Sequence, residues 1–362
     1  MDKPLLTGVL VLIVLAGVEC KKDEAVSPKA DWPFSGKILF TVDVPETPSI
    51  YMIDLHASPG TLSVLVSSAT EPRVAPDGVT VAYTGLQPGM IDIFKMDLSG
   101  GAPVDLTPNP SLTDSWSDWS PDGISILFNR VFYPGFKEGL CIINRYGENL
   151  RNLTDTTTIK EAFMGRWSPD GGTIAFLGLP SGGSSPYTLF TISSDGTHLA
   201  TLERAAPTMP VWSPDGLKIA YQRQLTPDDT TTGLYVFDVL GRQSERVGVS
   251  GATVTPSGFS WLSDGRLICV GADLTDTPGE YSIHLVTVSG SPAEQVLADG
   301  FTDIPVARPS PDGTWMAIIG TRHGDSGLGL YVTRPGGTGL RKILDTGMTG
   351  WITDGSYVQW VR

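Results

Sequence analysis

Carboxylates recur along this chain at an almost constant spacing, and each of them stands directly before a glycine. The seven aspartates of these Asp-Gly pairs are Asp77, Asp122, Asp170, Asp215, Asp264, Asp312 and Asp354. Carboxylate oxygens are ligands for hard cations, so a repeated set first suggests a metal site. However, about 45 residues separate each pair from the next, the length of a whole structural repeat. The set therefore spreads around the fold, and we expect these aspartates to build turns and to bind no metal.

Histidine is the other residue type that could carry metal or acid–base chemistry. The chain has four, His56, His198, His284 and His323, and none forms a pair with metal-ligand spacing. His323 is expected in a long irregular loop, which makes it the histidine to test. The Gly-x-Ser-x-Gly pattern of a hydrolase nucleophile is absent. The sequence thus predicts no catalytic residue, no metal ligands and no cofactor.

The segment around each Asp-Gly pair has the chemistry of a tight hairpin. In five of the seven pairs a proline comes immediately before the aspartate. Proline presets φ near about −65°, aspartate can accept hydrogen bonds from the backbone, and glycine takes positive φ without steric cost. Short β-branched or aromatic runs follow the turns, as in 124–128 and 218–221. Such runs favour strands.

One repeat, 209–247, contains four strand segments around a single Asp-Gly turn. Four antiparallel strands with a period in the forties indicate the blade of a β-propeller. The 42 glycines and 28 prolines among 362 residues argue against a helical fold. We therefore predict an all-β fold, a β-propeller of four-stranded antiparallel blades. Roughly 330 residues at about 47 per blade fit seven blades.

The two ends of the predicted propeller are expected to meet. Segments 37–41, 50–53 and 62–65 read as the second, third and fourth strands of a blade that lacks its first strand. Residues 350–352 can supply that strand from the C-terminal side. The segment 357–360 then duplicates a second strand, so that it either pairs at the seam or belongs to an incomplete eighth blade.

Residues 1–20 differ from the repeats. Lys3 precedes an apolar run, 4–18, which is too short for a comfortable membrane span and is typical of an export signal. The segment resembles a bacterial lipoprotein signal, in which the cysteine becomes the lipidated first residue of the mature protein. This resemblance implies lipidation of Cys20, with ordinary signal cleavage or an uncleaved anchor as alternatives.

The chain departs from the lipoprotein pattern at Val18 and Glu19, where that signal has small residues. The charged residues that follow predict a flexible tether over 21–35. We therefore expect an exported bacterial protein, periplasmic or associated with the outer membrane, which contacts the membrane through its lipid.

The charge balance restricts the partners. Acidic residues outnumber basic ones, 39 to 25, and the net charge is −14. This argues against a nucleic-acid partner, because nucleic-acid binding requires Lys and Arg to neutralise phosphates. Cys141 and Cys269 lie in strand segments of repeats that are not neighbours, so we expect two buried free thiols. We also expect a monomer.

The Trp-Ser-Pro-Asp-Gly runs 119–123, 167–171 and 212–216, each followed by a strand segment, resemble the repeat of TolB-type β-propellers. The resemblance covers residues 36–362 and implies a periplasmic or surface-exposed propeller. TolB itself carries an α/β domain ahead of a six-bladed propeller, and no such domain is expected between Cys20 and Lys37. A role like that of TolB in the Tol–Pal system is therefore not implied.

In such a blade the Asp-Gly turns share one end of the propeller with the turns between third and fourth strands. The other end, called the loop end below, carries longer and more acidic loops, and irregular loops on a rigid scaffold often bind ligands. The candidate binding residues expected at this end include Glu71, Asp114, Glu161 and Asp303, which should lie just before first strands and so near the mouth of the central channel. His323, in its long loop, is the fifth candidate. Our hypothesis is a negative funnel for a basic or metal-bearing partner. The alternative is that these are solvated charges that maintain solubility.

Two functions remain open. The first is a non-catalytic, lipid-tethered envelope propeller that binds a protein or peptide, with a basic partner favoured. The alternative is a metal-dependent polysaccharide lyase or hydrolase, since oligogalacturonate lyases resemble the chain in size and repeat type. That reading would place a divalent cation in the central channel. An acidic face counts against it, because an anionic substrate would be repelled.

Overall fold

The structure is a computed structural model, and all regular secondary structure that it describes is β-strand. It describes residues 36–42, 47–56, 61–132, 137–155, 157–182, 187–204, 209–223, 233–247, 252–273, 280–288, 294–302, 306–310, 312–345 and 359–361. The predicted signal, tether and Cys20 lie outside these ranges. Within them, no apolar helix of membrane-spanning length is found.

The described strands form antiparallel groups of four, which we number as blades along the chain. Blade 1 contains β28 (Gln359–Val361), β1 (Lys37–Val42), β2 (Ser49–Asp54) and β3 (Thr61–Ser67). Blade 2 contains β4 (Ala69–Val74), β5 (Thr80–Gln87), β6 (Met90–Asp97) and β7 (Val104–Asp105). Blade 3 contains β8 (Thr113–Trp119), β9 (Ser125–Phe132), β10 (Lys137–Asn144) and β11 (Arg151–Asn152). Blade 4 contains β12 (Ile159–Trp167), β13 (Thr173–Pro180), β14 (Thr188–Ser193) and β15 (Ala200–Arg204).

The remaining strands repeat the same order. Blade 5 contains β16 (Val211–Trp212), β17 (Lys218–Arg223), β18 (Gly233–Asp238) and β19 (Gln243–Val247). Blade 6 contains β20 (Ala252–Trp261), β21 (Leu267–Asp273), β22 (Tyr281–Val286) and β23 (Glu294–Phe301). Blade 7 contains β24 (Val306–Pro309), β25 (Met316–Gly320), β26 (Gly329–Thr333) and β27 (Arg341–Asp345).

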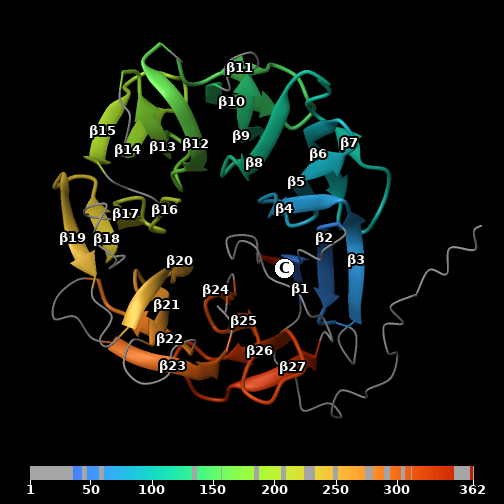
Figure 1. The fold of residues 1–362 in the computed structure, drawn as a ribbon, viewed down its shortest axis with the longest axis vertical. Helices are drawn as coiled ribbons and strands as arrows, with labels where there is room; N and C mark the ends of the chain where they lie inside the picture. Colours follow the sequence, from blue (N-terminus) through green and yellow to red (C-terminus); the bar gives the residue numbers. More distant parts are fainter. Residues whose placement is uncertain are drawn as a thin grey trace, which may run out of the picture.

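The blades stand in a ring, with β4, β8, β12, β16, β20 and β24 innermost (Figure 1). The predicted all-β propeller of four-stranded antiparallel blades is confirmed. The described residues hold seven such groups, while the total for the whole chain stays a prediction. Blades 2, 3 and 4 are also linked by single parallel bridges, Ile91 to Thr113 and Glu138 to Glu161.

The C-terminal strand supplies the innermost strand of blade 1. β28 pairs antiparallel with β1 and places Trp360 opposite Ile38. This is the register in which Trp119 lies opposite Ile126 in blade 3. The expectation that residues 350–352 supply this strand is therefore wrong. The tryptophan of β28 matches the innermost position, so the described residues of the predicted segment, Gln359 and Trp360, pair at the seam.

The apolar core lies in layers between neighbouring blades. One layer joins Ile93 of β6 to Trp119, Phe128 and Cys141 of blade 3, all of them buried. Cys141 and Cys269 are both free and buried, as predicted. Burial raises the pKa of the Cys141 thiol to about 12, so it stays neutral and packs as a small apolar group.

Tryptophans at the ends of four innermost strands connect blades 3, 5, 6 and 1 to the blade before each of them. Their indole N–H groups donate to backbone carbonyls about one repeat earlier. The four pairs are Trp119 to Arg73, Trp212 to Arg166, Trp261 to Val211 and Trp360 to Arg308, at 3.0 to 3.1 Å. The last of these joins blade 7 to blade 1 and so closes the ring.

Trp167 departs from this pattern. Its indole Nε1 is buried and makes no hydrogen bond within the described ranges. Instead its backbone N–H donates to Oδ2 of Asp118 at 3.2 Å, a contact that also joins blades 4 and 3.

This difference predicts unequal effects of one substitution at two equivalent positions. Trp119→Phe removes an indole donor and leaves the carbonyl of Arg73 without it, which should lower the free energy of unfolding by about 1 kcal/mol or more. Trp167→Phe keeps the aromatic ring and removes a donor that has no acceptor, so it should be close to neutral. Urea unfolding of both variants measures the difference. Equal destabilisation would show that the indole bond contributes nothing beyond ring packing.

Candidate functional site

The Asp-Gly turns are built from short-range hydrogen bonds. In blade 3, Ser120 Oγ donates to Asp122 Oδ1 at 2.5 Å, and the backbone N–H of Ile124 donates to the same oxygen at 3.0 Å. Gly123 adopts φ +69° and donates its N–H to the carbonyl of Ser120 at 2.8 Å. The serine–aspartate contact recurs at Asp170, Asp215 and Asp312. In the turns of Asp77 and Asp264, the backbone N–H two residues later likewise donates to the aspartate. Asp354 lies outside the described residues.

Neighbouring turns also touch one another. A Cβ on Gly123 would lie 3.5 Å from the proline ring of Pro76 in blade 2, and a Cβ on Gly171 would lie 3.5 Å from Pro121 in blade 3. The turns of blades 2 to 5 therefore form a rim at one end of the ring, and this end is called the turn end below.

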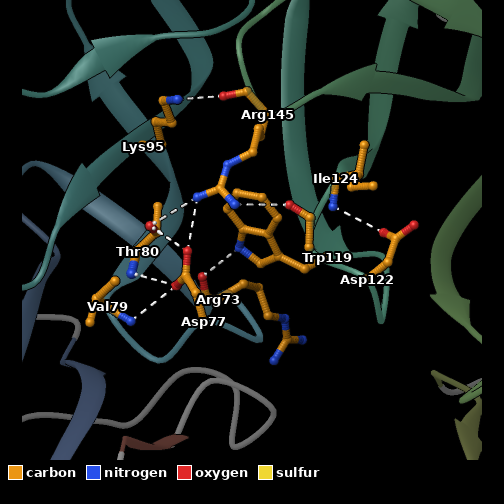
Figure 2. A network of polar contacts seen from close by, with 10 residues as sticks. Arg73, Asp77, Val79, Thr80, Lys95, Trp119, Asp122, Ile124 and Arg145 are labelled. Carbon is orange, nitrogen blue, oxygen red and sulfur yellow. Dashed lines mark hydrogen bonds and ion pairs between the residues drawn. The ribbon is translucent and has the colours of Figure 1, made fainter.

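Arg145 of blade 3 connects the Asp-Gly turn of its own blade to that of blade 2 through hydrogen bonds (Figure 2). Its Nη2 donates to Asp77 Oδ2 at 2.9 Å and to Thr80 Oγ1 at 3.3 Å, while Nη1 donates to the carbonyl of Gly123 at 3.3 Å. The guanidinium lies 5.7 Å from the centre of the Trp119 ring, a cation–π arrangement. Lys95 Nζ donates to the carbonyl of Arg145 and fixes it from blade 2.

The hydrogen bonds to Asp77 stabilise its ionised form. Burial raises the pKa of this carboxyl, but the N–H groups of Val79 and Thr80 and the guanidinium of Arg145 outweigh burial and hold the pKa at about 2. The ionised carboxylate of Asp77 therefore stabilises its turn and the contact between blades 2 and 3.

The predicted binding residue Glu71 also joins blades. It lies within β4, at a bulge between Thr70 and Arg73, and has φ +59°. Its Oε2 accepts from the backbone N–H of Trp116 at 2.7 Å and from Thr84 Oγ1 at 2.6 Å. The expectation that it precedes the first strand does not hold, because β4 begins before the bulge. The same correction applies to Asp114 in β8 and Glu161 in β12.

Asp114 is fully buried and forms a two-pronged ion pair with Arg130 of β9. Arg130 Nε and Nη2 donate to the two carboxylate oxygens at 2.7 and 2.6 Å. A second buried aspartate, Asp92 of β6, interacts electrostatically with this pair and with Asp105. Sequence reasoning missed Asp92 and Arg130, because both lie inside strands and their partners lie on other strands.

Glu161 lies beside a second carboxylate. It is bridged in parallel to Glu138 of β10, accepts from Tyr187 Oη at 3.2 Å and pairs with Lys160 at 3.2 Å. Burial raises the pKa of Glu138, against a hydrogen bond from Asn129 Nδ2 at 2.8 Å. Two carboxylates and a phenol therefore gather at the loop end of blades 3 and 4.

The structure does not bring the predicted binding residues together. Glu71, Asp114 and Glu161 belong to three different blades, and each is held by its own partners. His323 follows β25 in blade 7 and lies with its Nε2 2.8 Å from Glu280 Oε1. Asp303 lies outside the described residues. Among the residues that are described, no three His, Cys, Asp or Glu side chains are placed to hold one metal ion.

Exposed apolar side chains gather instead on and beside the turn end. Val79 and Ile124 directly follow the turn glycines and are 54% and 58% exposed, and Tyr146, in the turn after β10, is 71% exposed. Leu217 and Leu240 occupy corresponding positions in blade 5 and are also exposed. The apolar residue after Asp-Gly was visible in the sequence, but its exposure depends on the neighbouring turn.

No family model matches this chain. An uncharacterised protein of Agrobacterium fabrum is 27% identical over 224 residues, which are 56% of this chain and 70% of that protein. This similarity covers more than half of this chain but brings no activity with it.

Several solved structures share the fold. TolB from Acinetobacter baumannii has a TM-score of 0.50 and 19% identity over 73% of this chain, and the chain spans 64% of that protein. An oligogalacturonate lyase in complex with manganese has a TM-score of 0.63 and 15% identity, over 83% of this chain and 86% of the lyase. The β-propeller domain of the trilobed protease from Pyrococcus furiosus has a TM-score of 0.59 and 14% identity, over 87% and 97%. At these identities the likeness shows a propeller fold, TolB-like among others.

The Asp77 contacts predict a pH-dependent effect. Asp77→Asn should lower the free energy of unfolding by about 1 kcal/mol at pH 7, because the amide loses the charge that faces Arg145. The folded-state pKa lies below the value of 3.8 expected in the unfolded chain, so this contribution is present above 3.8 and is lost as the pH falls towards 2. In urea unfolding measured from pH 7 to pH 3, the difference in free energy of unfolding between wild type and variant should therefore begin to decrease below pH 4. Glu148→Gln, an exposed acid-to-amide change at the turn end, serves as the control. A difference in free energy of unfolding that stays constant with pH would show that the charge of Asp77 does not stabilise the fold.

Proposed function

We propose that this protein is an exported, lipid-anchored β-propeller that binds a protein or peptide without catalysis, and that the partner docks on the turn end. The observation that carries this proposal is the gathering of exposed apolar side chains over a rim of hydrogen-bonded turns. The acidic residues first expected to bind, Glu71, Asp114 and Glu161, are engaged within the ring.

The docking surface is centred on blades 2 and 3. Its exposed apolar side chains are Val79, Val104, Ile124, Tyr146 and Leu150. Lys95 Nζ lies 5.2 Å from the centre of the Tyr146 ring, and Lys95 is also the cross-strand partner of Val104. Tyrosine beside cationic side chains is typical of the residues that dominate binding energy in protein interfaces.

This surface is pre-organised. The backbone N–H of Tyr146 donates to Asn144 Oδ1 at 2.9 Å, and that of Arg145 donates to the carbonyl of Ile124 at 2.9 Å. A surface that is already ordered loses little conformational entropy when a partner binds. The net charge of −14 favours a basic partner through long-range attraction.

A metal-dependent polysaccharide lyase is the second candidate. Glu138, Glu161 and Tyr187 at the loop end are the observation that favours it, since a carboxyl of raised pKa beside a second carboxylate suits acid–base chemistry. The propeller of the manganese-bound lyase is the basis for naming this substrate class. Turnover of an oligogalacturonate with added Mn²⁺, lost in Glu138→Gln, would favour it.

Photo-crosslinking distinguishes the two ends. A photoreactive amino acid placed at Ile124 or Tyr146 in cells should yield a crosslinked protein, whereas one placed at Tyr187 should yield none. Tyr146→Ser should weaken the crosslink from position 124 at least tenfold, since interface aromatic residues often contribute about 2 kcal/mol or more. Crosslinks from position 187 alone would move the docking surface to the loop end and overturn this part of the proposal.

The anchor is tested separately. Cys20→Ser should move the protein from the membrane fraction to the soluble periplasmic fraction, because acyl chains supply the membrane affinity. Metabolic labelling with an alkyne fatty acid should mark the wild type and not the variant. An unlabelled wild type that stays with the membrane would point to an uncleaved anchor.

A further inference from the structure

Asp92 stands out from the residues at the same position in the other blades. One position of the third strand can be compared in all described blades. In blade 3 it is the residue that pairs with the fifth residue of the second strand, where Ile126 counts as the first and Phe128 as the third. In chain order these residues are Ser49, Asp92, Gly139, Thr188, Gly233, Ser282 and Gly329. Six of them are Gly, Ser or Thr, and only blade 2 has an ionisable side chain here.

The carboxyl of Asp92 is buried without compensation. Its exposed fraction is 0%, and neither of its oxygens makes a hydrogen bond in the described part of the chain. The backbone N–H of Asn109, in the connection between blades 2 and 3, lowers the pKa of Asp92, but burial outweighs this effect. Burying a charged group without partners is costly.

The neighbouring charges increase this cost. Asp105 of β7 and Asp114 of β8 repel an ionised Asp92, and Arg130 of β9 attracts it. However, Arg130 already makes two hydrogen bonds to Asp114. Cys141 of β10 also interacts with this pair, and its thiol stays neutral because burial raises its pKa to about 12. Asp92 and Asp114 therefore share the guanidinium of Arg130, and Asp105 adds a third negative charge beside Asp92.

We propose that Asp92 is a proton-binding site at the junction of blades 2 and 3, ionised at neutral pH and protonated on mild acidification, so that the ring becomes more stable as the pH falls towards 5. A proton removes the surplus charge directly, whereas the described carboxylates are not placed to ligate one cation together. This inference goes beyond the docking function and does not depend on it.

The direction of the effect follows from the two states of the chain. Burial, together with Asp105 and Asp114, raises the pKa of Asp92 from 3.8 to about 6 in the folded protein. Below 3.8 the group is protonated in both states and has no effect on stability. The folded state is penalised increasingly as the pH rises from 3.8 to about 6, and the penalty is complete above that range.

Equilibrium urea unfolding of the mature chain tests the proposal through Asp92→Ser, the residue that blades 1 and 6 carry at this position. Between pH 4.5 and pH 7.5 the unfolding equilibrium constant of the wild type, divided by that of the variant, should rise roughly 25-fold. Asp92→Asn, which keeps the shape, should remove the same pH dependence. Asp195→Asn, an exposed acid-to-amide change, should leave the wild-type dependence intact.

Carboxyl titration and added divalent cations test the proposal further, and three outcomes would overturn it. The ¹³C resonance of the Asp92 carboxyl, assigned by its loss in Asp92→Ser, should titrate with a midpoint near 6. A midpoint below 4.5, or a ratio of unfolding constants that does not change with pH, would show that the group stays ionised. If Mg²⁺ or Ca²⁺ at pH 7.5 stabilises the wild type but not the variant, a cation compensates the charge instead of a proton.

Discussion

The ring depends on one repeated interaction, the hydrogen bond from an indole N–H to a backbone carbonyl in the preceding blade. Apart from the single parallel bridges that β8 and β12 make to the preceding blades, an innermost strand has a strand neighbour on one side only. Its other edge therefore exposes backbone groups that need partners. Trp119, Trp212, Trp261 and Trp360 each satisfy one such carbonyl. Where the tryptophan is missing, as at Val74, a side chain takes over, since the Val74 N–H donates to Gln359 Oε1 at 2.7 Å. Hydrogen bonds at this position therefore join blades 1, 2, 3, 5 and 6 to the blade before each of them.

What could be predicted from the sequence was local. The Asp-Gly turn is closed by Ser120, Asp122 and Ile124, which lie within a few residues of one another, so its chemistry can be read from spacing alone. The partners of Glu71, Asp114 and Asp92 belong to other strands. Groups of the next blade act on Glu71 and Asp92, and Asp114 pairs with Arg130 on the neighbouring strand of its own blade. Single-sequence reasoning places such a residue on a strand or a loop but does not identify its partner. The same limit explains why the seam strand was assigned to the wrong segment.

The two ends of the ring differ in how they use charge. At the turn end, carboxylates such as Asp77 are neutralised by N–H groups and Arg145, and exposed apolar side chains project beyond them. At the loop end, Glu161 and Glu138 lie next to each other, and burial raises the pKa of Glu138. A net negative charge therefore does not mean that the acidic end binds the partner. Carboxylates that hold the scaffold are unavailable to a ligand.

The position of β28 has a consequence for how the protein is made. β1 is synthesised long before its inner neighbour, which comes from residues 359–361. Until those residues arrive, β1 keeps an open edge that can pair with another chain. Contacts between distant parts of a sequence also form slowly. The ring can therefore be completed only after residues 359–361 have been synthesised. A nascent chain that stalls before them would be exposed to aggregation or proteolysis at blade 1.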